Sequence, residues 1–167
     1  TFREHGRHAA QVLLTAQDLD DRASYLNVRN TLLSLMEFKA IPIINENDTV
    51  AVDELMTTFG DNDRLAALVT NLLGAELLVI LSDVDGLYSC DPSVKPGRES
   101  SPPEIIEHVD CITDDIEKLA GRSSSKVTVG GMYTKVLAAK QTMSFGIPTL
   151  IVNGFDSNIA DKIYEGL

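Results

Sequence analysis

The sequence predicts an α/β protein built on a mainly parallel sheet. Apolar runs that suit buried strands occur at residues 40–45, 76–83 and 147–154, and they alternate with segments of helical spacing. Strands that alternate with helices usually pair in parallel, with helices over both faces of the sheet. The 167 residues, 44% of them apolar, are enough for one domain with a mostly aliphatic core.

The first predicted elements are a helix over residues 21–38 and a strand over 40–45 that ends at a polar cluster. Apolar residues recur at helical spacing in the helix, and Asp20 or Asp21 precedes them as a cap. We interpret this helix as core or as a subunit interface. Its apolar positions are Tyr25, Val28, Leu32, Leu35 and Met36.

Residues 49–60 are predicted to be a loop that leads into a second helix. Asp61 and Asn62 are good caps for that helix, and Gly74 ends it. The continuous apolar run at 76–83 is typical of a strand that is buried on both faces.

The middle of the chain is predicted to be irregular. Residues 85–104 are rich in Gly, Pro and Ser, and residues 123–131 form a polar loop. Between them we expect a short strand over 104–109 and a short helix over 113–121, which Thr113 caps.

The last predicted elements are a helix, a strand and a closing helix. The first of these helices begins at Met132 and stops at Gly146, the strand covers 147–154, and the closing helix covers 156–167. No internal repeat and no domain boundary is evident.

Charge and composition exclude several classes of function. The net charge of −11 argues against binding to nucleic acid or to an anionic membrane surface, and no stretch is apolar enough to span a membrane. Cys90 and Cys111 form no metal-binding pair, and we interpret them as reduced thiols of a cytoplasmic protein. Glu4, His5 and His8 are more typical of a solvated helix face than of a metal site.

Polar residues end each predicted strand, and ligands collect at the carboxyl ends of parallel strands. Asn45 and Asp48 either close a turn or bind a small polar ligand. Ser82 and Asp83 either start a turn or face the same ligand. Because all of them lie on one predicted rim, we favour a binding site.

Two predicted helix starts extend this rim. Residues 61–63 are Asp, Asn and Asp, although one cap needs only one such residue. Gly130 and Gly131 precede a helix whose N-terminus would attract an anion, and Lys135 lies about one turn inside it. An ordinary glycine-rich loop with a solvated lysine fits this spacing equally well. Neither a Walker A nor a GxGxxG motif is present.

Four motifs together resemble the glutamate 5-kinase branch of the amino acid kinase family. They are PIINENDTV, GDNDRLAALVTNLLGAELLVILSDVDGLYSCDP, GGMYTK and GIPTLIVNG, and they run in order over almost the whole chain. The resemblance implies a three-layer αβα sandwich around a mainly parallel open sheet. It also implies that residues 1–167 are the C-terminal two-thirds of one kinase domain. The family's N-terminal strand, its next glycine-rich loop and the RNA-modification-type C-terminal domain of some members are not in this sequence.

The implied activity is transfer of the γ-phosphoryl group of ATP, with Mg²⁺, to the side-chain carboxylate of L-glutamate, the first step of proline biosynthesis. The fragment alone need not have this activity. The resemblance also implies feedback inhibition by proline, a homo-oligomer (dimer or tetramer) and a cytoplasmic location. Alternatives are the kinase half of a bifunctional pyrroline-5-carboxylate synthase, or a family member that acts on N-acetylglutamate, aspartate, carbamate or UMP. A non-catalytic amino-acid sensor is a further alternative.

The resemblance assigns roles to individual residues. Asp48 would take the ammonium group of glutamate, and Asn62, together with Asn45 or Asn47, would donate to a carboxylate. Lys135 would stabilise the transferring phosphoryl group, and Asp63 would hold catalytic lysines in place. No general base is needed because the nucleophile is already ionised. The implied nucleotide contacts are Ser82, Asp83, Val129, Gly130, Gly131, Met132, Tyr133, Thr134 and Lys135.

One motif departs from the family pattern. The family usually has Gly-Thr before its glycine pair, whereas Thr128 and Val129 stand there in this chain. This difference leaves one hydroxyl contact to phosphate unassigned. A sensor would have no use for Lys135 and Asp63, so their presence favours catalysis.

Overall fold

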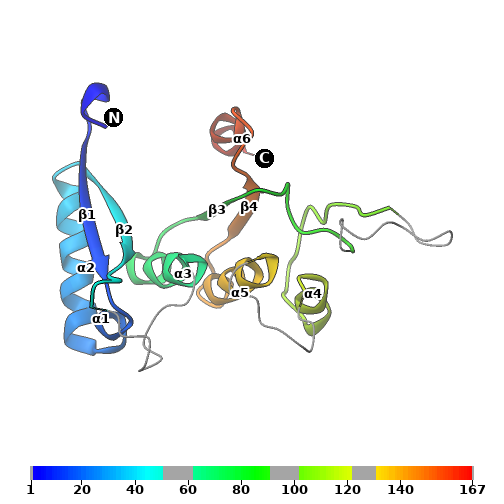
Figure 1. The fold of residues 1–167 in the computed structure, drawn as a ribbon, viewed down its shortest axis with the longest axis horizontal. Helices are drawn as coiled ribbons and strands as arrows, with labels where there is room; N and C mark the ends of the chain where they lie inside the picture. The colour runs from blue at the N-terminus through cyan, green and yellow to red at the C-terminus, as the bar shows by residue number, and fades with distance from the viewer. Residues whose placement is uncertain (1, 51–61, 91–101, 122–130, 167) are drawn as a thin grey trace. The chain divides into compact units, whose positions relative to one another are not determined.

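The computed structural model describes residues 2–50, 62–90, 102–121 and 131–166. The chain divides into two compact units, Thr1–Ala75 and Glu76–Leu167. Each unit has its own helices and its own pair of parallel strands (Figure 1). The predicted α/β class with parallel strands is therefore confirmed. The boundary is not evident in the sequence, because residues 74–77 directly connect a helix to a strand.

Unit 1 is built on two strands that pair in parallel. His8 lies opposite Ala40 at one end of the pair, and Leu14 lies opposite Glu46 at the other. The elements of this unit are η1 (Phe2–His5), β1 (His8–Leu14), α1 (Ala16–Asp20), α2 (Arg22–Glu37), β2 (Ala40–Glu46) and α3 (Asn62–Leu73).

The helices of unit 1 begin and end where local signals predict. The Asp21 side chain accepts the Ser24 N–H at 2.8 Å and caps α2, which confirms one of the two predicted caps. Gly74 follows α3 with a φ of +61°, a left-handed conformation that favours glycine. Arg29 on α2 donates from Nε to the Leu72 carbonyl at 3.1 Å, so it satisfies an acceptor at the end of α3.

The core of unit 1 joins the sheet to its helices. Leu14, the last residue of β1, and Leu65 on α3 are both buried. Leu32 on α2 is completely buried, which agrees with its predicted place in the core. The half-buried apolar residues that pack against Leu14 and Leu65 are Val12, Ala16, Leu19, Val28, Ile44, Leu68 and Val69.

The N-terminal segment differs from the predicted helix face. Glu4 and His5 lie in a short 3₁₀ helix, and His8 is the first residue of β1. All three are exposed, as expected, but His8 belongs to a strand. The strand was missed because the sequence HAAQVLL contains two alanines and alternates only weakly, while its pairing partner β2 lies far along the chain.

Unit 2 is built on a second pair of parallel strands. Leu78 lies opposite Thr149 at the start of the pair, and Ser82 lies opposite Asn153 at its end. The elements of this unit are β3 (Leu78–Ser82), α4 (Asp114–Leu119), α5 (Met132–Met143), β4 (Thr149–Asn153) and α6 (Ile159–Glu165). Thr113 caps α4 as predicted, because its hydroxyl accepts the Ile116 N–H at 3.5 Å.

The predicted strand over 104–109 is wrong. Only one antiparallel bridge forms there, between Tyr88 and Ile105. Ile106 and Val109 instead pack against the core around Leu87, at a spacing of three residues that a strand does not use to bury one face. Within the described ranges, no helix is both long and apolar enough to cross a membrane.

Candidate active site

The polar cluster after β2 forms a turn. The Asn47 N–H donates to the Leu14 carbonyl at 2.8 Å, which ties the turn to the end of β1. The Asn47 side-chain Oδ1 accepts the Thr49 hydroxyl at 2.6 Å. The turn interpretation therefore holds for Asp48, which lies within this turn, whereas Asn45 is still a residue of β2. Asn45 and Asp48 are both exposed at this carboxyl end of the sheet.

The start of α3 lies at the same end of unit 1. Asn62 is the first residue of α3 and is exposed, whereas Asp63 is half-buried. Leu65, one turn further on, packs against Leu14 at the end of β1. The first turn of α3 is therefore close to the turn that carries Asp48. The unit 1 residues expected to bind glutamate and to hold lysines therefore lie on neighbouring elements, at the end of β2, in the turn after it and at the start of α3.

In unit 2, the ends of β3 and β4 approach each other closely. The Gly154 N–H donates to the Ser82 carbonyl at 2.8 Å. A Cβ atom on Gly154 would lie 3.1 Å from the Leu81 Cβ, so this position favours glycine. The buried Ser82 hydroxyl donates to Asp83 Oδ1 at 3.3 Å, while Asp83 itself is exposed.

Asp85 connects both strand ends. Asn153 Nδ2 donates to Asp85 Oδ1 at 2.8 Å, and the Tyr88 hydroxyl donates to Asp85 Oδ2 at 3.2 Å. The Asn153 Oδ1 accepts the Phe155 N–H at 2.9 Å, so both ends of the Asn153 amide are used. Burial, and then the nearby Asp85 charge, raise the pKa of the Tyr88 hydroxyl above its usual 10.0. Like an ordinary tyrosine, Tyr88 is protonated at neutral pH and can donate.

The start of α5 has the geometry of an anion-binding helix terminus. Gly131 precedes the helix with a φ of +105° and a ψ of −173°, a conformation almost restricted to glycine. The Thr134 hydroxyl donates to the Gly131 carbonyl at 2.9 Å. Lys135 is the fourth residue of the helix and is half-buried. No side chain at Gly131 competes for the N–H groups of the first turn, which makes them suitable donors to a phosphate.

Packing places this helix start beside the loop that follows β3. Met132 and Tyr133 pack in the cluster that contains the buried Leu87. At the other end of α5, the hydroxyls of Thr142 and Thr149 are 2.6 Å apart, which fixes the helix end near the start of β4. The helix therefore runs back along the strands, and its N-terminus lies toward their carboxyl ends.

Some predicted site residues cannot be placed. Val129 and Gly130, two of the predicted nucleotide contacts, lie outside the described residues. The same is true of Asp61 and of the predicted loop from residue 51 onward.

Sequence reasoning missed several polar residues at the strand ends. Asp85 and Tyr88 lie inside one of the motifs above but had no assigned role, and the hydrogen bond between Asp85 and Asn153 spans 68 residues. At the end of β1, the Thr15 N–H donates to Asp18 Oδ2 at 2.8 Å and the Thr15 hydroxyl accepts the Asp18 N–H at 3.3 Å, which forms a capping box for α1. The Thr-x-x-Asp spacing was a usable signal for that cap.

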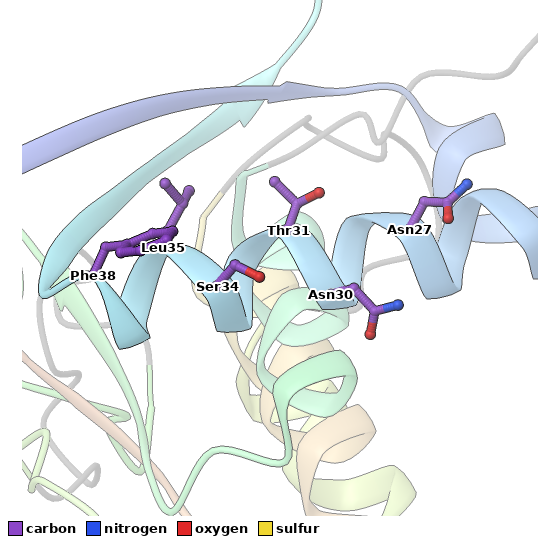
Figure 2. Close-up of a pocket in the computed structure, with 6 residues that line it drawn as sticks. All are labelled: Asn27, Asn30, Thr31, Ser34, Leu35 and Phe38. Atoms are coloured by element: carbon purple, nitrogen blue, oxygen red, sulfur yellow. The ribbon is translucent and has the colours of Figure 1, made fainter.

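A pocket in unit 1 is lined by residues of α2 and by Phe38, which follows that helix (Figure 2). None of its lining residues is a predicted site residue, and Phe38 is 79% exposed. The lining residues are Asn27, Asn30, Thr31, Ser34, Leu35 and Phe38. Among the described residues, no group of three or more His, Cys, Asp and Glu side chains is placed to hold a metal ion.

These features define an α/β protein in which each unit has polar groups at the carboxyl end of its parallel strand pair, and in which unit 2 also has a glycine-preceded helix suited to phosphate. Comparison with known sequences gives the family. Residues 1–153 match the sequence profile of the amino acid kinase family, and the chain belongs to that family.

Several curated proteins similar to this chain are named glutamate 5-kinase. The chain is 48% identical to that of Nitrosospira multiformis and 50% identical to that of Geobacter metallireducens, each over 165 residues. It is 48% identical to that of Dehalococcoides mccartyi over 166 residues. In each case 99% of this chain is aligned, but it spans only 42 to 43% of the relative's length.

Proposed function

We propose that this chain is part of a kinase that transfers the γ-phosphoryl group of ATP to the side-chain carboxylate of L-glutamate, the step that opens proline biosynthesis in the cytoplasm. The observation that carries the proposal is the group of relatives named glutamate 5-kinase, at about half identity over 99% of the chain. The residues at the strand ends of each unit support it chemically.

The unit 1 residues suit an amino acid. Glutamate carries an ammonium group and a carboxylate on its α-carbon. The exposed Asp48 carboxylate would accept from the ammonium group, and the amides of Asn45 and Asn62 would donate to the carboxylate. The half-buried Asp63 would hold catalytic lysines near the reacting groups.

The unit 2 residues suit a polyphosphate. The N–H groups at the start of α5 would donate to phosphate oxygens, and Lys135 would neutralise charge on the transferring group. Ser82 and Asp83 at the end of β3 would contact the nucleotide. A bound Mg²⁺ would supply further charge neutralisation. Since the described residues offer no acidic cage, we expect that ion to be held mainly by phosphates and water.

The proposed reaction needs no proton transfer. A side-chain carboxylate oxygen of glutamate attacks the γ-phosphorus, a new P–O bond forms, and the bond to the β,γ-bridging oxygen breaks. The products are glutamyl 5-phosphate and ADP. Because both reactants are anions, the protein must contribute positioning and positive charge rather than a base.

The test measures ADP release by the full-length protein from Mg-ATP with L-glutamate, N-acetylglutamate, L-aspartate or UMP, each with and without proline. Turnover with glutamate alone supports the proposal, and suppression by proline would support the predicted feedback inhibition. Turnover with a different acceptor would contradict the proposed roles of Asp48 and Asn62. Light scattering on the same sample tests the predicted dimer or tetramer.

A further inference from the structure

Two successive residues at the carboxyl end of β4, Asn153 and Gly154, are hydrogen-bonded to the segment that ends β3. Gly154 holds the main chain of Ser82 through its N–H, and Asn153 holds the side chain of Asp85 through Nδ2. The bonds are both 2.8 Å long. Between the two anchored residues stand only Asp83 and Val84.

We propose that Asp85 and Asn153 form a clamp that positions the Ser82–Asp83 segment for the nucleotide. This inference rests on the proposed function, because it needs a nucleotide at the end of β3. Asp85 and Asn153 are positioning residues here, and neither is assigned a contact with the substrate.

The geometry of the Asn153 amide explains how the clamp is held. Its Oδ1 accepts from the Phe155 N–H at 2.9 Å, so the amide cannot turn over without losing that bond. Nδ2 is thereby directed toward Asp85 Oδ1, and the acceptor is a carboxylate, which strengthens the bond.

A second anchor holds the other oxygen of the same carboxylate. The Tyr88 hydroxyl donates to Asp85 Oδ2 at 3.2 Å. Gly86, which follows Asp85 in the sequence, is buried, and a Cβ there would lie 3.4 Å from Ile105 Cγ2. The loop from Asp83 to Tyr88 is therefore fixed on both sides of Asp85, and loss of the clamp should loosen the part that precedes it.

The experiment compares the full-length protein with Asp85→Ala, Asn153→Ala and the double variant. Calorimetry gives the Kd for Mg-ADP, and kinetics give the KM for ATP, the KM for glutamate and kcat. We expect each single variant to raise the Kd for ADP and the KM for ATP about tenfold, as befits loss of one charge-assisted bond. The KM for glutamate and kcat should change by less than about twofold. The double variant should be no worse than the worse single variant, because both remove the same interaction.

Two further variants separate positioning from folding. Asn153→Asp is isosteric but sets two carboxylates against each other, so it should weaken ADP binding more than Asn153→Ala. Asp85→Asn keeps an oxygen acceptor for Asn153 and should recover most of the affinity. Asp156→Ala is the control, since Asp156 follows the same strand but bonds to Asn158 and Lys162 instead. It should bind ADP as the unchanged protein does.

The possible results distinguish this inference from the proposed function. Unchanged ADP binding in Asn153→Ala and Asn153→Asp, or additive effects in the double variant, would overturn the clamp. If the unchanged protein binds Mg-ADP but does not phosphorylate glutamate, the proposed function fails and the ADP affinities alone decide on the clamp. A protein that binds no Mg-ADP would contradict both.

Discussion

Lys140 Nζ lies 2.5 Å from Glu117 Oε1, and this ion pair joins α5 to α4. The two side chains differ in environment, because that of Glu117 is 5% exposed and that of Lys140 is 50% exposed. Burying a charge is costly unless it is paired. Loss of the ion pair should therefore cost more free energy when it leaves Glu117 charged and buried than when it leaves Lys140 charged and half exposed. The contact ties the helix that carries Lys135 to its neighbour.

We expect removal of the lysine to destabilise unit 2 more than removal of the carboxylate. Lys140→Met takes a partner from the buried Glu117 charge and should cost about 2 kcal/mol, less than a fully buried pair because Lys140 is half exposed. Glu117→Gln leaves Lys140 able to turn to solvent and should cost less. Urea unfolding of the full-length protein measures both values.

Lys118→Met is the matched control for this pair. Lys118 is bonded to Asp115 at 2.8 Å, but both side chains are largely exposed. Its loss should cost less than about 0.5 kcal/mol. An equal cost for Lys118→Met and Lys140→Met would contradict the importance of burial at Glu117.

The helices with local signals were predictable from the sequence. Asp21 and Thr113 cap α2 and α4 as expected, because a cap depends on residues only three positions away. The strands β2, β3 and β4 were also found, since each is a dense apolar run ended by polar residues.

Features that depend on distant residues were not predictable. The β1 strand becomes a strand by pairing with β2, and its own sequence has little β preference. The bond between Asn153 and Asp85 joins residues 68 positions apart. At the candidate site, the sequence could nominate Asp48, Asn62 and Lys135 by type and position, but not the hydrogen bonds that hold the segments around them.

The Asp21 cap should make unit 1 sensitive to acid. Hydrogen bonding from the Ser24 N–H lowers the pKa of Asp21 below its usual 3.8. Because the pKa is lower in the folded than in the unfolded state, the stabilisation is fully present above about pH 3.8. It is lost as the pH falls through the folded-state pKa.

Asp21→Asn tests this dependence, since asparagine also caps helices but does not titrate. The difference in free energy of unfolding between the unchanged protein and Asp21→Asn should be constant near neutral pH. Below about pH 3.8, the unchanged protein should lose stability relative to Asp21→Asn. Chemical unfolding of the full-length protein at several pH values measures it. Asp20→Asn is the control, and a similar change in that variant would argue against the cap as the source.

Gly131 should be required for its backbone conformation. Its φ of +105° is strained for any residue with a side chain, although a Cβ there would meet no atom of the described residues within 4 Å. Gly131→Ala should therefore destabilise the protein by about 1 to 3 kcal/mol or shift the helix start. Either change should raise the KM for ATP, because the N–H groups of the first turn would move.

Gly146→Ala provides the matched control for the helix start. Gly146 follows the other end of α5 with a φ of +75°, and a Cβ there would also meet no atom within 4 Å. It should lose stability with little change in the KM for ATP. Equal effects of both variants on the KM for ATP would contradict a phosphate contact at the start of α5.

Asp48 should contribute to the affinity for glutamate. Asp48→Ala removes a charged acceptor for the ammonium group and should raise the KM for glutamate roughly tenfold or more, with the KM for ATP nearly unchanged. Steady-state kinetics of the full-length protein measure both. Asp20→Ala, at the end of α1 in the same unit, is the control. An unchanged KM for glutamate in Asp48→Ala would remove Asp48 from the proposed site.

Lys135 should act on turnover rather than on substrate binding. In the transition state, the glutamate carboxylate and the phosphoryl group, both negatively charged, come close together. A lysine at the start of α5 would stabilise this transition state more than the ground state. Lys135→Met should therefore lower kcat by about a hundredfold or more, with smaller changes in both KM values. Lys162→Met is the control, because Lys162 lies on the closing helix α6 and pairs with Asp156, which precedes that helix. If Lys135→Met kept near-normal kcat while its Kd for Mg-ADP rose, Lys135 would be a ground-state phosphate contact, and the transition-state role would be wrong.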